Sequence, residues 1–312
     1  MITFEIRPVP PFRLDLTVWA LKRRVTYGVE GWDGTTYRRV LLDGERPFSL
    51  SVEQVGTTGD PVLLVQASTD PDRKVVNDRE KLATEACAKL LGTQTDLAAF
   101  YDIADASPEL SPLVDRLRGM KPPRYLSLFE ALTNAITCQL ITLTVGLRIL
   151  DRFATRYGMP LPGTVENEGP SRAFPRVQDI ELVEADALRD AGYSRQKARA
   201  LTEIAVLADD GVLNATSYSD LDDDSAVNRL RALHGVGRWT AEYVLLRGLG
   251  RLNVFPGDDV GVRRHLERWL DLPDRLDHAG VQQTLAPWAP FAGLIYLHLV
   301  VNGIVDSGLV TS

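Results

Sequence analysis

Two adjacent carboxylates stand where a side chain could take part in chemistry. Asp258 and Asp259 follow a Val-Phe-Pro-Gly segment and precede an apolar helical pattern at Val262, Leu266 and Leu270. An aspartate at that place can cap the helix through its first backbone N–H groups. A fixed carboxylate can also stabilise positive charge that develops in a transition state, or orient an attacking water. Position alone favours the cap, so both interpretations stay open at this point.

A glycine turn precedes these carboxylates. Leu233–Ala241 reads Leu-His-Gly-Val-Gly-Arg-Trp-Thr-Ala, with one predicted helix before the turn, capped by Asp224 or Ser225, and a second helix after it. We expect Gly235 and Gly237 to adopt positive φ and to let a partner approach the backbone closely. The N–H groups that begin the second helix would then face an anion such as phosphate. A turn with only a structural role is the alternative.

Two aromatic residues lie four positions apart on the second predicted helix. Trp239 and Tyr243 share one helix face and could stack against a flat ring. An aromatic face also attracts a cationic ring more than a neutral one. Packing in the core is the alternative for both residues.

The chain upstream predicts a second pair of helices. After Ser127, a residue type preferred at the N-cap of helices, apolar residues recur at spacings of three and four. Cys138–Thr142 interrupts the run, and its β-branched residues and capping threonine indicate a tight turn between two helices. Leu140 lies in this turn but also fits the apolar stripe, so a place in the core is its alternative. The stripe comprises Phe129, Leu132, Ile136, Leu140, Leu143, Leu147 and Leu150.

The pattern divides the chain into an N-terminal sheet, residues 1–76, and a helical region, residues 77–312. In the first part apolar and polar residues alternate over residues 12–18, which predicts a strand. Asp43-Gly44 marks a turn, and 50–52 and 62–65 supply further strands of an antiparallel sheet. Asn77 or Asp78 would cap the first long helix, which would end at Gly92.

The composition excludes several classes of protein to which this chain could belong. Of 312 residues 45% are hydrophobic, enough for one large or two medium domains. The two cysteines exclude a disulfide framework and four-cysteine zinc or iron–sulfur sites. The N-terminus has no signal-peptide pattern, and the apolar stretch 292–305 is too short to span a bilayer. We therefore expect no membrane partner and a cytoplasmic protein. The net charge of −7 argues against nucleic-acid binding, unless one face of the protein is locally basic and binds phosphates.

The segment from Gly235 to Tyr243, Gly-Val-Gly-Arg-Trp-Thr-Ala-Glu-Tyr, resembles the hairpin of the helix-hairpin-helix (HhH-GPD) DNA glycosylase superfamily. Within it, the similarity is greatest to the bacterial 3-methyladenine DNA glycosylases of AlkA type. Asp259 lies 22 residues beyond Gly237, where the family carries its essential aspartate. Phe129–Ile141 resembles the family's helix pair and the turn that enters the duplex, and Gly192–Ala198 resembles another helix start of the family. The likeness covers residues 80–305.

The resemblance implies an α+β fold, an antiparallel sheet packed on a helical HhH core that holds an active-site cleft. It implies a base excision repair enzyme, a monomer that hydrolyses the N-glycosidic bond of alkylated purines in damaged double-stranded DNA. Asp259 would be catalytic, and Asp258 would become the better cap. Trp239 and Tyr243 would form the base pocket, with Leu140 as the wedge that replaces the extruded base. The expected DNA-binding residues are Gly235, Val236, Gly237, Arg238, Thr240, Gln139, Leu140 and Ile141.

The resemblance also bears on cofactors and on the reaction type. Family members that cleave the strand carry a lysine where this chain has Trp239, so we expect an abasic product and no lyase step. No metal or cofactor is expected, although hairpin carbonyls could hold a monovalent cation; a bacterial enzyme would associate with the nucleoid. Val260 and Val300 replace aromatic residues of the bacterial enzymes, which implies a wider pocket. His298 is predicted to be a core histidine. A glycosylase for oxidised or deaminated bases and a non-catalytic DNA-binding module remain alternatives.

Overall fold

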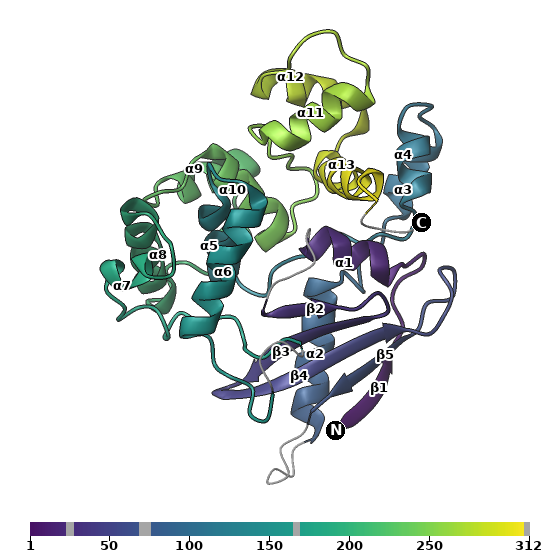
Figure 1. Cartoon of the computed structure of the whole chain (residues 1–312). Helices are drawn as coiled ribbons and strands as arrows, with labels where there is room; N and C mark the ends of the chain where they lie inside the picture. Colours follow the sequence, from purple (N-terminus) through teal and green to yellow (C-terminus); the bar gives the residue numbers. More distant parts are fainter. Residues whose placement is uncertain (23–27, 69–75, 165–168, 309–312) are drawn as a thin grey trace.

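A five-stranded antiparallel sheet forms the N-terminal part of the computed structural model, which describes residues 1–22, 28–68, 76–164 and 169–308 (Figure 1). The strand order is β1-β5-β4-β3-β2. Alternate residues of β4, Phe48, Leu50 and Val52, are fully buried, as expected for a sheet with one covered face. The predicted turn at Asp43-Gly44 is confirmed, and Gly44 has φ +61°. The strands are β1 Ile2–Ile6, β2 Glu30–Trp32, β3 Thr36–Asp43, β4 Arg46–Gln54 and β5 Leu63–Ala67.

The strand predicted over residues 12–18 is wrong, because α1 (Leu14–Lys22) is a helix. The polar residues that suggested alternation are satisfied locally: Arg13 Nη2 lies 2.5 Å from Asp15 Oδ2, and Thr17 Oγ1 donates to the Arg13 carbonyl. Residues 16–22 are buried on every side. A helix without an exposed face has no apolar stripe, so periodicity cannot distinguish it from a strand.

Helix α2 (Val76–Leu90) covers one face of the sheet (Figure 1). Its buried residues Ala83, Ala86, Cys87 and Leu90 share a core with the strands. The predicted end at Gly92 is confirmed by its φ of +59°. The predicted cap at Asn77 or Asp78 concerns side chains outside the described residues. The division at residue 76 stays a proposal, and α2 belongs to the core of the sheet although it follows that boundary.

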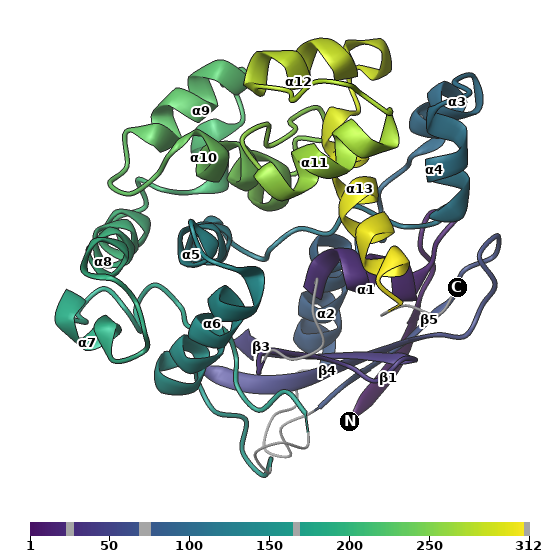
Figure 2. The ribbon, with the colours of Figure 1, turned by 45° about the horizontal axis from the view of Figure 1, so that its top comes forward.

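The remaining helices form two groups with separate cores (Figure 2). One group contains α5, α6, α7, α8, α9 and α10, and the other contains α1, α3, α4, α11, α12 and α13. The bounds are α3 Ala98–Asp105, α4 Leu110–Arg116, α5 Leu128–Cys138, α6 Leu143–Tyr157, α7 Ala185–Arg189, α8 Arg195–Asp209, α9 Asp223–Arg231, α10 Arg238–Val244, α11 Val260–Trp269, α12 His278–Leu285 and α13 Ala292–Asp306, with short helices η1 Ala215–Tyr218, η2 Leu245–Leu249 and η3 Ala286–Trp288.

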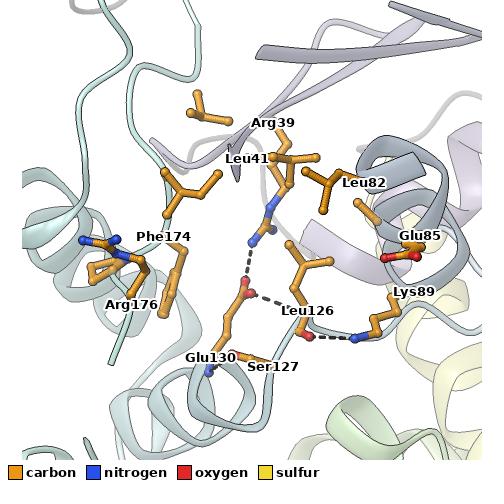
Figure 3. Close-up of a pocket in the computed structure, with 15 residues that line it drawn as sticks. Arg39, Leu41, Leu82, Glu85, Lys89, Leu126, Ser127, Glu130, Phe174 and Arg176 are labelled. Atoms are coloured by element: carbon orange, nitrogen blue, oxygen red, sulfur yellow. Dashed lines mark hydrogen bonds and ion pairs between the residues drawn. The ribbon is translucent and has the colours of Figure 1, made fainter. Parts of the chain in front are cut away.

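A buried ionic cluster joins the sheet to the helices. Arg39 on β3 pairs with Glu30 on β2, and its Nη2 lies 2.6 Å from Glu130 Oε1 on α5. All three side chains are at most 4% exposed. Arg39 and Glu130 line a pocket of about 280 Å³ between β3, α2 and the start of α5 (Figure 3). Neither Asp259 nor the glycine turn lines this pocket.

None of the described helices is by itself long and apolar enough to cross a membrane. Residues His278–Trp288 and Ala292–Asp306 meet the criteria of length and composition only as a pair, and the chain bends by 103° between them.

Candidate active site

Asp259 has the capping role that its position in the sequence suggested, and its second carboxylate oxygen takes no part in the cap. It is the N-cap of α11, and its Oδ1 accepts a hydrogen bond of 3.0 Å from the Val262 N–H. Because the cap is Asp259, the predicted role of Asp258 as the cap is wrong; Asp258 is exposed. The second oxygen of Asp259, Oδ2, is free of the helix and accepts from Trp239 Nε1 at 3.3 Å and from the Tyr296 hydroxyl at 2.8 Å. One oxygen therefore fixes the carboxylate to the backbone while uncharged donors orient the other.

Tyr296 on α13 is the site residue that the sequence did not reveal. It is 3% exposed, and a buried tyrosine hydroxyl requires a hydrogen-bond partner. That requirement was the available signal, because Tyr296 stands among apolar residues, Leu294, Ile295 and Leu297. Its partner lies 37 residues earlier in the chain, a pairing that no local pattern contains.

The indole ring of Trp239 stacks on the ring of Tyr243. The two rings stack with centroids 5.4 Å apart at 28°, and the Tyr243 hydroxyl lies 3.1 Å from that of Tyr125. Tyr243 is 1% exposed, whereas Trp239 is only partly buried. Of the two expected pocket residues, Trp239 is the one that presents surface, and Tyr243 holds it in place.

The glycine turn has one left-handed residue rather than two. Gly235 has φ +76°, and a Cβ there would lie 2.8 Å from Ala200 Cβ. Gly237 has φ −87°, so its predicted positive φ is wrong. A Cβ on Gly237 would meet no atom within 4 Å, which leaves open surface before the first turn of α10. The helix before the turn, α9, is capped by Asp222 and not by the predicted Asp224 or Ser225.

The remaining hairpin residues divide between surface and core. Arg238 is exposed at the start of α10, while Val236 and Thr240 are buried. Thr240 Oγ1 accepts a hydrogen bond from Gln139 Nε2, which also donates to the Gly235 carbonyl at 2.9 Å. Gln139 therefore joins the turn between α5 and α6 to the hairpin.

The turn between α5 and α6 exposes Leu140 to solvent. Leu140 is fully exposed and has φ +55°, a conformation that costs a non-glycine residue roughly 1–2 kcal/mol. The alternative that placed Leu140 in the core is wrong. Ile141 beside it is 37% exposed. The predicted Thr142 cap of α6 is confirmed by its hydrogen bond from the Val145 N–H.

Lys197 on α8 braces the same turn. Its Nζ donates to the carbonyls of Thr137 at 2.9 Å and Gln139 at 2.7 Å. Both lie at the C-terminal end of α5, where carbonyls lack partners within the helix. The sequence placed Lys197 at a family-like helix start, which the Ser194 cap confirms, but it did not indicate this contact.

The first turn of α10 thus connects three elements. Trp239 contacts Asp259 at the start of α11, and Thr240 contacts Gln139 in the turn that carries Leu140. The carboxylate, the hairpin and the exposed leucine are therefore held by two consecutive residues, at the place where the two helical cores meet (Figure 2).

Three further residues lie outside this arrangement. Val260 is 49% exposed, and Val300 is partly buried. His298 is 1% exposed and its Nδ1 lies 2.8 Å from the Leu294 carbonyl. Burial lowers the pKa of His298 to about 4, so the ring is neutral and belongs to the core.

The described residues contain no group of three or more His, Cys, Asp or Glu side chains arranged to hold a metal ion. A monovalent cation on the hairpin carbonyls stays a prediction.

Comparison with known proteins agrees with the geometry. The family HhH-GPD superfamily base excision DNA repair protein matches residues 133–290. DNA-3-methyladenine glycosylase 2 of Escherichia coli is 31% identical over 272 residues, which cover 83% of this chain and 90% of that protein.

Two solved structures share the fold. A 3-methyladenine DNA glycosylase from Archaeoglobus fulgidus aligns with a TM-score of 0.79 at 24% identity, covering 96% of this chain and 98% of that one. An 8-oxoguanine glycosylase/lyase from Clostridium acetobutylicum, in complex with double-stranded DNA, aligns with a TM-score of 0.75 at 15% identity, covering 98% and 99%. The resemblance inferred from the hairpin is confirmed, as is the α+β fold: the chain belongs to the HhH-GPD superfamily of base excision DNA repair proteins.

Proposed function

We propose that this chain is a monofunctional DNA glycosylase that hydrolyses the N-glycosidic bond of alkylated purines in duplex DNA. The observation that carries the proposal is the Asp259 carboxylate, whose Oδ2 is oriented by Trp239, on the helix that follows the glycine turn, and by Tyr296 on α13. The similarity to the Escherichia coli 3-methyladenine glycosylase over most of both chains supports the same activity.

The proposed reaction begins with binding and base extrusion. Backbone N–H groups at Gly237 and the start of α10 bind a phosphate of the damaged strand. Leu140, already displayed on its turn, enters the base stack and replaces the extruded nucleotide. Gln139 keeps this side chain at a fixed place relative to the hairpin.

The chemical step is loss of the base from the sugar. Cleavage of the N-glycosidic bond leaves C1′ with oxocarbenium character, and the negative charge of Asp259 stabilises it. The cationic purine leaves as the neutral base with the electron pair of the broken bond. Water then adds to C1′ and transfers its proton to the Asp259 carboxylate, so the products are the free base and an abasic site. An alkylated purine is cationic, leaves readily, and is attracted by the face of Trp239.

The absence of strand cleavage follows from position 239. A lyase step needs an amine that forms a Schiff base with the sugar, and this chain has an indole there whose N–H is donated to Asp259. We therefore propose that the abasic strand is left intact.

Base release from duplexes that carry methylated purine, 8-oxoguanine or uracil tests the proposal. We expect release of the methylated purine, little release of the other two, and strand breakage only after alkali. Release of 8-oxoguanine or uracil in preference to methylated purine would establish the alternative substrate classes. Binding without release from any duplex would establish a DNA-binding module instead.

A further inference from the structure

Glu242 on α10 is a second carboxylate near the candidate site. It is buried beside the turn that ends at Asp259. Glu242 is 6% exposed and follows Trp239 by one helical turn. Its Oε2 accepts a hydrogen bond of 3.1 Å from the Gly257 N–H, and its Oε1 lies 2.6 Å from Nε2 of His278, at the start of α12. Neither the reaction proposed above nor the packing of α10 requires a charge at this place.

The burial of Glu242 has a free-energy cost. Burial raises the pKa of this carboxyl, while His278 and the Gly257 N–H act in the opposite direction. Buried carboxylates are retained in proteins when specific hydrogen bonds compensate for lost water. Gly257 belongs to the segment that ends at Asp259, and the His278 ring lies against Gly257, so both groups that compensate Glu242 meet at that segment.

Gly257 is part of a closed turn that ends at Asp259. The Asp259 N–H donates to the Pro256 carbonyl at 2.9 Å, while the Gly257 N–H is held by Glu242. His278 fills the space beside Gly257, because a Cβ on that glycine would lie 2.8 Å from His278 Cδ2. The turn is therefore fixed from α10 by a hydrogen bond and from α12 by a ring.

Helix α10 thus contacts the same short segment twice. Trp239 donates to the Asp259 side chain and Glu242 accepts from the backbone two residues before it. In Figure 2 α10, α11 and α12 lie close together, and the turn leads directly into α11. Two contacts from one helix determine both where the turn sits and where its carboxylate points.

We propose that Glu242 and His278 are positioning residues that hold the Pro256–Asp259 turn and thereby aim the Asp259 carboxylate. The role rests on the proposed function of Asp259. Because the effect acts through Asp259, loss of Glu242 lowers the rate of base release and leaves DNA binding unchanged.

The first test separates rate from binding. Single-turnover release of methylated purine should fall about 10- to 100-fold in Glu242→Ala, since small displacements of a reacting group have effects of that size. The dissociation constant for a duplex with an abasic site should stay within about twofold of native. Glu242→Gln should keep most of the rate, because its amide oxygen accepts from Gly257 and its NH₂ can donate to His278.

Glu267 offers a matched control. It is 7% exposed and accepts from the Leu276 N–H at 2.9 Å and from Arg275 at 3.0 Å, so it is a buried carboxylate that holds a loop away from Asp259. Glu267→Ala should lower the melting temperature and leave the rate per folded molecule unchanged. Equal losses of rate in Glu242→Ala and Glu267→Ala would overturn the proposal, as would a native rate in Glu242→Ala.

The second test does not depend on catalysis. The indole N–H of Trp239 donates to Asp259, so its NMR resonance, assigned with Trp239→Phe, reports whether the carboxylate is in place. Glu242→Ala should move this resonance toward its position in Asp259→Ala, and Glu242→Gln and Glu267→Ala should leave it near native. A resonance that Asp259→Ala moves and Glu242→Ala does not would refute the positioning role. If the native protein released no base, the proposed function would fail while this measurement still decided the positioning role.

Discussion

Two regions of the molecule hold a carboxylate in place, and they do so with different chemistry. At the junction of sheet and helices, Glu130 is 3% exposed and pairs with the equally buried Arg39. At the meeting of the two helical cores, Asp259 is only partly buried, and its partners are the uncharged Val262 N–H, Trp239 and Tyr296.

The difference separates a structural carboxylate from one suited to reaction. Burial raises the pKa of Glu130 and Arg39 opposes the rise, so the charge is cancelled where it lies. Neutral donors orient Asp259 without cancelling its charge, which leaves that charge available to a cationic sugar. Charged partners thus mark the cluster that joins the two parts of the fold, and neutral partners mark the site.

Removing the cation from the structural cluster should have the largest effect. Arg39→Met leaves Glu30 and Glu130 buried without a counter-charge, and we expect the free energy of unfolding to fall by about 3–5 kcal/mol. Denaturant unfolding measures this loss. Base release per folded molecule should be unchanged.

The neighbouring Arg38 is the matched control for that experiment. It pairs with Asp33 at the surface, where both side chains are more than 40% exposed, so Arg38→Met should cost less than about 1 kcal/mol. Similar losses for the two variants would show that the buried cluster has no special structural role.

Neutralising Asp259 should lower the rate of base release and leave the stability of the fold unchanged. Asp259→Asn keeps an oxygen that can accept from the Val262 N–H, so the cap persists, while base release should fall about 10²- to 10³-fold. Single-turnover release measures the rate, and thermal unfolding measures the stability. Asp258→Asn, on the exposed neighbour, should match native in both; loss of rate there instead would assign the reaction to the other aspartate.

A smaller effect is expected from removing one neutral donor. Tyr296→Phe deletes the 2.8 Å hydrogen bond to Asp259 Oδ2 and should lower the rate of release about tenfold, since hydrogen bonds to charged groups contribute about 1.5–3 kcal/mol. Binding to an abasic duplex should not change. A rate that fell as far as in Asp259→Asn would indicate that the hydroxyl takes part in the reaction and does more than orient the carboxylate.

The smallest effect concerns the wedge. Leu140→Ala should lower release about fivefold by weakening base extrusion, whereas Leu182→Ala, which truncates another leucine that is 89% exposed, should have no effect. Leu140→Gly should also relieve the left-handed backbone and leave the free energy of unfolding equal to or above native by up to about 1 kcal/mol. Fluorescence of a 2-aminopurine beside the lesion would report extrusion. Unchanged fluorescence in Leu140→Ala would assign the wedge elsewhere.

The features that the sequence revealed are local ones. The Ser127 and Thr142 caps, the turn between α5 and α6, and the Gly235 hairpin each depend on a few adjacent residues with strong conformational preferences. The family resemblance added the distance from the hairpin to Asp259. Together these features predicted the α+β fold, which the comparisons confirm.

The features that the sequence missed depend on tertiary contacts. Helix α1 is buried on all sides, so its pattern resembles that of a strand, and only its packing between the sheet and α13 decides its conformation (Figure 1). Tyr296, Lys197 and Glu242 each act on a partner at least 15 residues away. The assignment of the cap to Asp259 rather than Asp258 likewise follows from the residue at which α11 begins, Val260.

The left-handed conformation of Leu140 has a consequence for the search along undamaged DNA. Because the turn is built by Gln139 and Lys197 within the protein, the leucine protrudes before any lesion is met. In the mechanism proposed above, every base step that passes the turn between α5 and α6 would encounter the same apolar side chain. Base pairs that are already loosened would open at the least cost, so recognition in this mechanism would begin with the weakened stacking of a damaged step and precede any inspection of the base.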